Sequence, residues 1–275
     1  MNEVQVVVFS KNRAMQLDCC LHSFFDNCVE KVDINVLYTT TSEEHENSYK
    51  ILQKTYENVV FFREMSFKSD LLSILCNKIY ILFVVDDAIF TTPFSLQKII
   101  NLLKYHSKTI GFSLRLGKNT NYNYPYDSLQ IIPKYTISDN VMIYRWTTAN
   151  LDFAYPVELS SSLYLVSDIL PVLEQTEYKN PNDLEWMFYI NLGYFANIKS
   201  LIACFETSVA FCNPINMVQQ VNNNRSGRNP ELNPEKLLEL FNDGYRIYIE
   251  KFNGFVSNAC HQEVELEFIK DDNEL

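Results

Sequence analysis

The sequence predicts an α/β protein in which helices flank a mostly parallel sheet. Strand-like and helix-like segments alternate four times within about the first 105 residues, which is typical of doubly wound α/β folds. One strand-like segment is hydrophobic at every position, as expected for a strand buried on both faces of a sheet. With 275 residues, the chain is long enough to bury a large core.

The alternation starts close to the first residue. Residues 4–9 form a nearly continuous run of β-branched and aromatic side chains, which predicts a strand. A polar stretch follows, and apolar residues then recur at helical spacing as far as Phe24. Residues 34–38 repeat the strand pattern, and Ser42 is placed to cap a second helix with an acidic first turn.

Two further strand and helix pairs complete this half of the chain. Residues 59–62 predict a short strand, and residues 71–74 belong to a helix. Residues 79–85 are the fully hydrophobic segment and are expected in the middle of a parallel sheet. Pro93 is then expected to open a fourth helix, whose apolar face contains Leu96, Ile99, Ile100 and Leu103.

The pattern becomes less regular beyond residue 111. Strands are expected at residues 112–116 and 162–166. Asn180 with Pro181, and Asn233 with Pro234, each form a cap and first-turn pair that predicts a helix start. The second of these helices is expected to continue through Tyr248, with one face formed by Leu238, Phe241, Tyr245 and Tyr248.

Two segments near the end of the chain have distinct compositions. Residues 222–229 contain no apolar side chain and predict a mobile loop. Residues 263–268 alternate glutamate with apolar residues, which predicts an edge strand with one acidic face. No interdomain linker is visible, so residues 1–275 are expected to form one domain. Its expected parts are about 1–110, a smaller mixed region at about 111–210, and about 211–275.

Charge and composition exclude several classes of protein. The net charge of −11, with no basic run, disfavours nucleic acid as a partner. The longest apolar run, residues 79–85, is far short of the roughly 20 residues that cross a bilayer. The first residues do not resemble a signal peptide. The seven cysteines lack metal-site spacing and are expected to be reduced, buried thiols of a cytoplasmic protein.

The carboxyl ends of parallel strands are where ligands bind in such sheets. Asp86 and Asp87 end the most hydrophobic strand, and two adjacent carboxylates there are unfavourable unless a positive charge pairs with them. Mg²⁺ or Mn²⁺ prefers one or two carboxylates together with phosphate oxygens, so the pair predicts a metal site that holds a nucleotide diphosphate. The alternative is that both carboxylates cap the helix expected near Pro93.

Several segments, taken in order, resemble the GT-A fold glycosyltransferases, which use nucleotide sugars as donors. VVVFSKNR at residues 6–13 looks like the first strand and nucleotide loop of that family, and FVVDDAIF at residues 83–90 looks like its metal-binding strand. FSLRLGKN, NPNDLEWMF and NPINMVQQVNNNR look like the acceptor side. The resemblance implies a Rossmann-like sheet with an acceptor-side mixed region. Ala88 departs from the family's pattern, which usually has an acid at that position.

The resemblance also implies roles for particular residues. An acid at the start of the helix near the acceptor acts as catalytic base in inverting members, and Asp183 and Glu185 are the candidates. Asp183 and Glu185 are two positions apart, and side chains at that spacing on a helix project about 200° apart, so only one of them can face the site. Asp183 is placed where an acid stabilises a helix N-terminus, so Glu185 is the preferred base. The alternative for Glu185 is a solvated charge on the helix face.

Donor binding and metal binding are expected at the strand ends and in the late loop. Arginines of the loop are expected to close over the leaving diphosphate, although arginines there also serve solubility. Asp87 and Asp86 are the expected ligands of Mn²⁺ or Mg²⁺. The expected donor-binding residues are Ser10, Asn12, Arg13, Tyr38, Asp86, Arg115, Arg225 and Arg228.

The function expected from the resemblance is transfer of a hexosyl group to a carbohydrate or glycolipid acceptor, in bacterial surface polysaccharide or lipopolysaccharide synthesis. Inverting chemistry is preferred, and peripheral membrane contact stays open. One alternative is a nucleotidyltransferase, which would ordinarily carry a glycine-rich loop that residues 10–13 lack. Another is a non-catalytic domain that binds a nucleotide sugar or a partner protein, an alternative that Ala88 favours.

Overall fold

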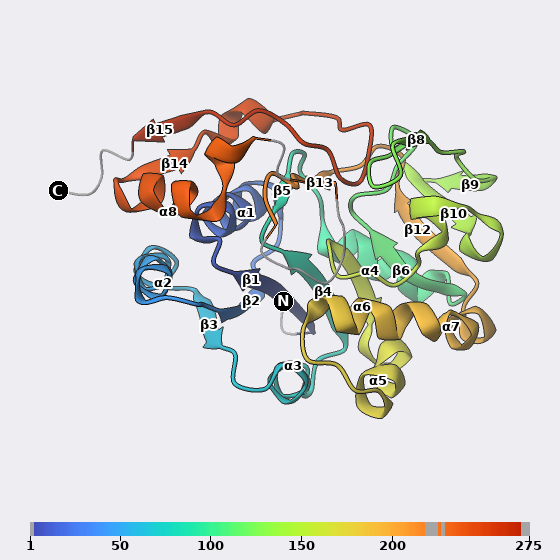
Figure 1. Cartoon of the computed structure of the whole chain (residues 1–275). Helices are drawn as coiled ribbons and strands as arrows, with labels where there is room; N and C mark the ends of the chain where they lie inside the picture. Colours follow the sequence, from blue (N-terminus) through green and yellow to red (C-terminus); the bar gives the residue numbers. More distant parts are fainter. Residues whose placement is uncertain (1–2, 218–224, 227–228, 271–275) are drawn as a thin grey trace.

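The computed structural model describes residues 3–217, 225–226 and 229–270, which form a mixed α/β fold around a central sheet (Figure 1). Within these residues the sheet has nine strands. Their order is β3 (Val59–Arg63), β2 (Asp33–Thr39), β1 (Val4–Lys11), β4 (Tyr80–Val85), β11 (Ser162–Leu165), β6 (Thr109–Ser113), β12 (Leu201–Phe205), β10 (Val141–Arg145) and β9 (Tyr135–Ser138).

The sheet is mostly parallel, as predicted. Strands β3, β2, β1 and β4 pair in parallel. Strand β11 is antiparallel to both β4 and β6, so β6 runs in the same direction as β4, and β12 is parallel to β6. The strand predicted for the middle of a parallel sheet, β4, therefore has a parallel neighbour on one side only. Its edge position within the parallel group places Asp86 where the sheet changes direction.

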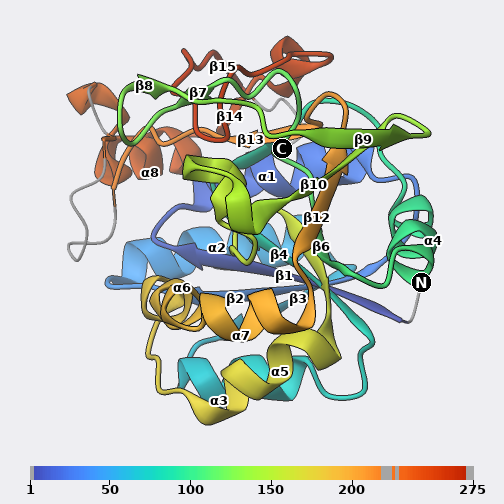
Figure 2. The same cartoon turned by 90° about the vertical axis from the view of Figure 1, so that its right-hand side faces the viewer.

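Helices cover both faces of the sheet, because alternate side chains of the strands point to opposite cores. Val6 and Val8 of β1 belong to one hydrophobic cluster, whereas Val7 and Phe9 belong to the other. The first cluster includes residues of α1 (Ala14–Asn27), α2 (Glu43–Thr55), α4 (Leu96–Tyr105) and α8 (Pro234–Asn242). The second includes residues of α3 (Phe67–Ile74), α5 (Val166–Gln175), α6 (Pro181–Ile190) and α7 (Leu192–Ile198), which lie below the sheet in Figure 2.

The predicted strand and helix pairs of the first half are confirmed, with two shifted boundaries. Helix α4 begins at Leu96 and not at Pro93, because Ser95 caps it and the Glu30 carboxylate accepts the Leu96 N–H at 2.8 Å. Strand β6 ends at Ser113, before the predicted end. A short strand, β5 (Ala88–Phe90), follows Asp87 directly and pairs with β13 (Ala210–Cys212). This strand separates Asp86 and Asp87 from α4, so the helix-capping alternative is wrong.

The end of the chain differs from the prediction. Helix α8 ends at Asn242, because Gly244 adopts a φ of +82° and the chain then enters β14 (Tyr245–Ile247). The strand predicted at residues 263–268 is wrong except at its last residue: residues 263–267 are irregular, and β15 (Phe268–Lys270) pairs with β14 beside α8 in Figure 1. Short elements also include β7 (Tyr122–Asn123), β8 (Ser128–Leu129) and the 3₁₀ helices η1 (Trp146–Thr148), η2 (Leu151–Ala154), η3 (Pro230–Leu232) and η4 (Ile249–Phe252).

Two expectations from composition can be compared with the fold. All seven cysteines are free, and five of them are buried, as predicted for mostly buried thiols. In the part of the chain that the structure describes, no helix has the length and apolar character needed to cross a membrane.

Candidate active site at the strand ends

A cavity of about 990 Å³ lies at the carboxyl ends of β1, β2 and β4. Residues 9–13 end or follow β1, Thr39 ends β2 and Thr41 follows it, and Asp86 and Asp87 follow β4. The N-terminal turns of α6 supply the opposite wall. The cavity is large enough for a nucleotide-sized ligand, since ligand pockets typically span ~300–1,000 Å³.

Asp86 and Asp87 are paired with an arginine from the end of β1. Arg13 Nη1 lies 2.9 Å from Asp86 Oδ1 and 3.4 Å from Asp87 Oδ2. The Arg13 side chain is 11% exposed, so this positive charge is built into the cavity wall. Burial disfavours the charged guanidinium, but the two carboxylates outweigh it and raise the pKa of Arg13 above its ordinary value. Arg13 thus supplies positive charge beside the two carboxylates, where the sequence predicted a divalent metal ion.

Arg13 is held on its other side by a residue far away in the sequence. Its Nε donates to Asn216 Oδ1 at 2.9 Å, and its Nη2 donates to the Asn216 carbonyl. Gln16 donates to the same Asn216 Oδ1 at 3.1 Å. The sequence analysis did not single out Asn216 or Gln16. The quoted segment NPINMVQQVNNNR contains Asn216, but nothing in its composition indicates a contact with residue 13.

The remaining strand-end residues form hydrogen bonds around Asp86. Ser10 Oγ donates to Asp86 Oδ2 at 2.8 Å and lies 2.5 Å from the hydroxyl of Tyr49 on α2. Asn12 has a φ of +56°, and its side chain bonds to Thr41 through both its oxygen and its nitrogen. The loops after β1 and β2 are therefore tied together at the mouth of the cavity.

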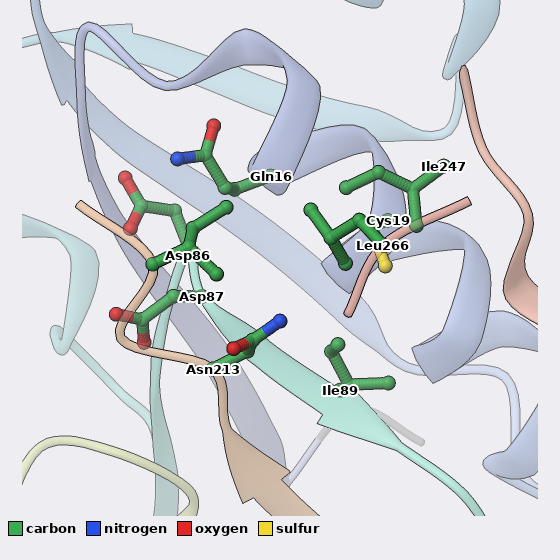
Figure 3. Close-up of a pocket in the computed structure, with 9 residues that line it drawn as sticks. Gln16, Cys19, Asp86, Asp87, Ile89, Asn213, Ile247 and Leu266 are labelled. Carbon is green, nitrogen blue, oxygen red and sulfur yellow. The ribbon is translucent and has the colours of Figure 1, made fainter. Parts of the chain in front are cut away.

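Behind the two carboxylates there is little free space. A void of only about 10 Å³, roughly the space of one water molecule, lies between them and the side chains of Ile89, Ile247 and Leu266. Figure 3 shows both carboxylate groups turned away from Ile247 and Leu266. The large cavity is therefore the side of the carboxylates with room for a ligand.

These residues fit a divalent cation only together with a ligand that brings its own oxygens. Among the described residues, no group of three or more histidine, cysteine or acidic side chains is arranged to hold a metal ion. Asp86 already accepts bonds from Ser10, Lys11 N–H and Arg13, whereas Asp87 has a longer contact with Arg13 and a hydrogen bond with the Cys212 thiol. Two carboxylates plus phosphate oxygens match the preference of Mg²⁺. Asp86 and Asp87 remain the predicted metal ligands.

On the opposite wall, α6 separates the two acidic candidates as the helix phase predicted. Asn180 caps α6 by accepting the Asp183 N–H at 2.9 Å, and Asp183 accepts the Lys179 N–H at 3.2 Å. Asp183 is thus part of the helix start and does not line the cavity. Glu185 does line it, and its Oε1 accepts the Leu159 N–H at 3.2 Å. The catalytic roles of both residues stay predictions.

Glu185 is desolvated by the protein and lies near a second carboxylate, Glu158. Burial raises its pKa, and the nearby charge of Glu158 raises it further, to about 7. Glu158 is itself buried and pairs with Arg115 at 2.7 Å. A carboxyl group with a pKa near neutrality can exchange a proton with a ligand at physiological pH. Glu158 is a site residue that the sequence does not predict, because nothing in its local sequence marks it as a neighbour of α6.

Three predicted donor-binding residues lie away from the cavity surface. Tyr38 is buried against Tyr49, with ring centroids 4.6 Å apart, and does not line the cavity. Arg115 is buried behind the wall in its pair with Glu158. Arg225 packs on the β7 and β8 hairpin, where Nη1 lies 2.8 Å from both the Tyr122 hydroxyl and Asp127 Oδ1.

The predicted loop at residues 222–229 can be compared only in part. Arg228 and most of this loop lie outside the described residues. Ser226, next to Arg225, does line the cavity. Trp146 is buried and donates its Nε1–H to the Lys199 carbonyl, so its ring is not available to stack on a sugar.

The chain is similar in sequence to a known glycosyltransferase and, more weakly, to several solved structures. No protein-family model matches the chain. In an alignment of 188 positions that covers 61% of its length, the chain is 31% identical to the bifunctional glycosyltransferase pgtA of Dictyostelium discoideum. The match confirms the predicted resemblance to glycosyltransferases. It covers 24% of the length of pgtA, so the chain corresponds to about a quarter of that protein.

Solved structures show weaker similarity. One similar structure is that of TarS residues 1–349 from S. aureus in complex with UDP. The superposition covers 75% of this chain and 58% of the TarS chain, with a TM-score of 0.48 and 11% identity. The mannosyltransferase PcManGT from Pyrobaculum calidifontis, in complex with GDP-Man and Mn²⁺, matches 66% of this chain and 50% of that chain. Its TM-score is 0.37 at 9% identity.

Proposed function

We propose that the chain is a GT-A-type glycosyltransferase that moves a sugar from a nucleoside diphosphate donor to a carbohydrate acceptor. One observation carries the proposal. The same cavity is lined by the strand-end carboxylates Asp86 and Asp87 and by Glu185, an acid whose pKa is raised to about 7. The sequence similarity to a bifunctional glycosyltransferase supports it.

In the proposed reaction, Glu185 accepts a proton from the acceptor hydroxyl as that oxygen attacks the anomeric carbon of the donor sugar. The bond from that carbon to the diphosphate breaks, and the nucleoside diphosphate leaves with the electron pair. A positioned base of this kind is worth roughly 10²–10⁴ in rate. Attack from the face opposite the diphosphate inverts the anomeric carbon, which is the predicted stereochemical outcome.

The strand-end residues are proposed to hold the donor. Ser10, Asn12, Arg13 and Asp86 line this part of the cavity. Mn²⁺ or Mg²⁺, held by Asp87 with Asp86 and by diphosphate oxygens, would neutralise negative charge on the leaving group. Arg228 keeps its predicted role at the diphosphate as an expectation about the late loop, whereas Arg225 would have to leave Tyr122 and Asp127 to reach the diphosphate.

The biological setting follows from the resemblance alone. Synthesis of a bacterial surface polysaccharide or lipopolysaccharide, a cytoplasmic location and a glycolipid acceptor stay predictions. The nucleotide and the sugar depend on the shape of the cavity and are left open.

A donor panel tests the proposal. Calorimetric titration of UDP- and GDP-hexoses, with Mn²⁺ and then with EDTA, is expected to identify one saturably bound donor, and sugar release from that donor is then measured. Asp87→Asn is expected to lose the metal-dependent part of the affinity. Saturable binding without hydrolysis or transfer would favour the non-catalytic alternative. No binding of any donor would contradict the proposed function.

A further inference from the structure

We infer that two exposed aromatic side chains of α6, Trp186 and Tyr189, form a platform on which a pyranose ring of the acceptor stacks. Trp186 is 56% exposed and Tyr189 is 50% exposed. Their ring centroids are 5.4 Å apart and their planes differ by 25°, so the two rings form an offset stack in which one ring supports the other. The inference rests on the proposed function, because it assigns the acceptor side of the same cavity.

The platform is continuous with the cavity. At about 100° per residue, Asn182, Glu185, Trp186 and Tyr189 fall within one helix face about 100° wide. Asn182 and Glu185 line the cavity, and Tyr189 lies one turn beyond Glu185 on the same face. Leu184 and Phe188 occupy the opposite face and are fully buried. A sugar stacked on the platform would therefore lie beside the proposed base.

A neighbouring residue fixes the orientation of this helix face. Tyr155 donates its hydroxyl to the Glu185 carbonyl at 3.2 Å, and its ring centroid lies 6.4 Å from that of Tyr189. Tyr155 thus contacts both the helical turn that carries Glu185 and the Tyr189 ring of the platform.

The chemistry of the platform favours a sugar over a protein partner. A pyranose has apolar C–H faces and a rim of hydroxyl groups, which suit aromatic rings whose edges carry polar groups. Asn182 and Glu185 add polar groups beside the rings. Two half-exposed rings present far less area than the roughly 800 Å² per partner that a stable protein interface buries.

Tryptophan fluorescence tests the platform directly, because the chain has only two tryptophans and Trp146 is buried. In Trp146→Phe, emission comes from Trp186 alone. Methyl α- and β-pyranosides of glucose, galactose and mannose, and their linear trisaccharides, are titrated into this variant. We expect a saturable change of emission for at least one sugar series. The same titration of Trp146→Phe with Tyr189→Ala should show affinity about tenfold weaker.

Kinetics provide a second measurement that does not need Trp146→Phe to fold. Trp186→Ala is expected to raise the ratio of acceptor KM to donor KM about tenfold. Tyr105→Ala removes an aromatic ring from another exposed helical site, 85% exposed on α4, and should leave that ratio unchanged. An unchanged ratio in Trp186→Ala, or no response of Trp186 to any sugar, would overturn the platform.

The outcomes separate this inference from the proposed function. If the unmodified protein neither hydrolyses nor transfers sugar from any donor, the proposed function is contradicted. The fluorescence titration measures sugar binding without turnover, so it tests the platform independently. Concentration-dependent self-association that Trp186→Ala abolishes would identify the platform as a protein interface and overturn the inference.

Discussion

The two walls of the cavity treat their charges in opposite ways. At the strand ends, Asp86 and Asp87 are compensated by Arg13, which is held in turn by Asn216. On α6, the charged group that most raises the pKa of Glu185 is another carboxylate, Glu158. The first wall is a completed network of the folded chain. The second wall holds an acid, Glu185, whose pKa is near neutrality, so that it can exchange a proton with a bound ligand.

The largest expected effect concerns the second wall. Glu185→Gln keeps the shape of the side chain but removes its ability to take a proton. Transfer should fall by about two to four orders of magnitude, with donor affinity retained. Single-turnover transfer and calorimetric donor binding measure the two quantities separately.

Asp183→Asn is the matched control for that prediction, because it changes the acid at the helix start of α6 in the same way. It should leave transfer close to that of the unmodified protein, since Asp183 interacts with the backbone of residue 179 and not with the cavity. Strong loss in Asp183→Asn with little loss in Glu185→Gln would reverse the assignment of the base.

The first wall is expected to respond mainly through stability. Arg13→Met leaves two adjacent carboxylates uncompensated in a largely buried position. We expect a loss of about 3–5 kcal/mol in the free energy of unfolding, the range for breaking a buried pair. Urea unfolding followed by circular dichroism measures it.

Lys251→Met is the control for Arg13→Met, because it breaks an exposed ion pair with Glu267 at 2.8 Å. Exposed pairs contribute little, so its stability should hardly change. Mn²⁺ should raise the melting temperature of Arg13→Met more than that of the unmodified chain, since the cation then meets two free carboxylates. Equal stability losses in both variants would show that Arg13 is not the compensating charge.

The sequence predicted one of these walls better than the other. Ser10, Arg13, Asp86 and Asp87 were found because strand ends in a parallel sheet converge, a rule that needs only the strand assignment. Asn216 and Glu158 were not predicted, because each acts on a residue far away in the sequence. Asn216 lies about 200 residues from its partner Arg13, and Glu158 lies 27 residues from Glu185. Local patterns carry no information on such contacts.

The same limit explains the fold-level errors. The period of α8 continues in sequence to Tyr248, but Gly244 at positive φ and pairing of β14 with β15 end the helix earlier. The antiparallel insertion of β11 beside β4 is likewise a tertiary pairing. Its sequence has the same apolar character as that of a parallel strand.

A pH profile sharpens the comparison with a smaller effect. With the pKa of Glu185 raised to about 7 by burial and by Glu158, kcat/KM should rise about tenfold per pH unit below neutrality and level off above it. Stability should change in the opposite direction. The folded chain binds the Glu185 proton more tightly than the unfolded chain does. The contribution of this proton to the free energy of unfolding is therefore fully present below pH ~4.3 and is lost as the pH rises to about 7. Glu185→Gln should lack both trends, and identical stability profiles would contradict the raised pKa.

The smallest expected effect tests whether the completed network serves the ligand or only the fold. Tyr49 and Tyr56 of the α2 region both bury a hydroxyl: that of Tyr49 meets Ser10 Oγ and the Arg13 N–H, and that of Tyr56 donates to Asp18. Replacing either by phenylalanine should cost about 1 kcal/mol of stability, the usual net value of one hydrogen bond. Only Tyr49→Phe removes a contact from residues that line the cavity, so only it should raise the donor KM, by about two- to fivefold. If both variants lose stability equally and neither changes the donor KM, the hydrogen bonds behind Asp86 support the fold alone. The donor would then be positioned by the surface groups of the cavity, Arg13 and Asp87 among them.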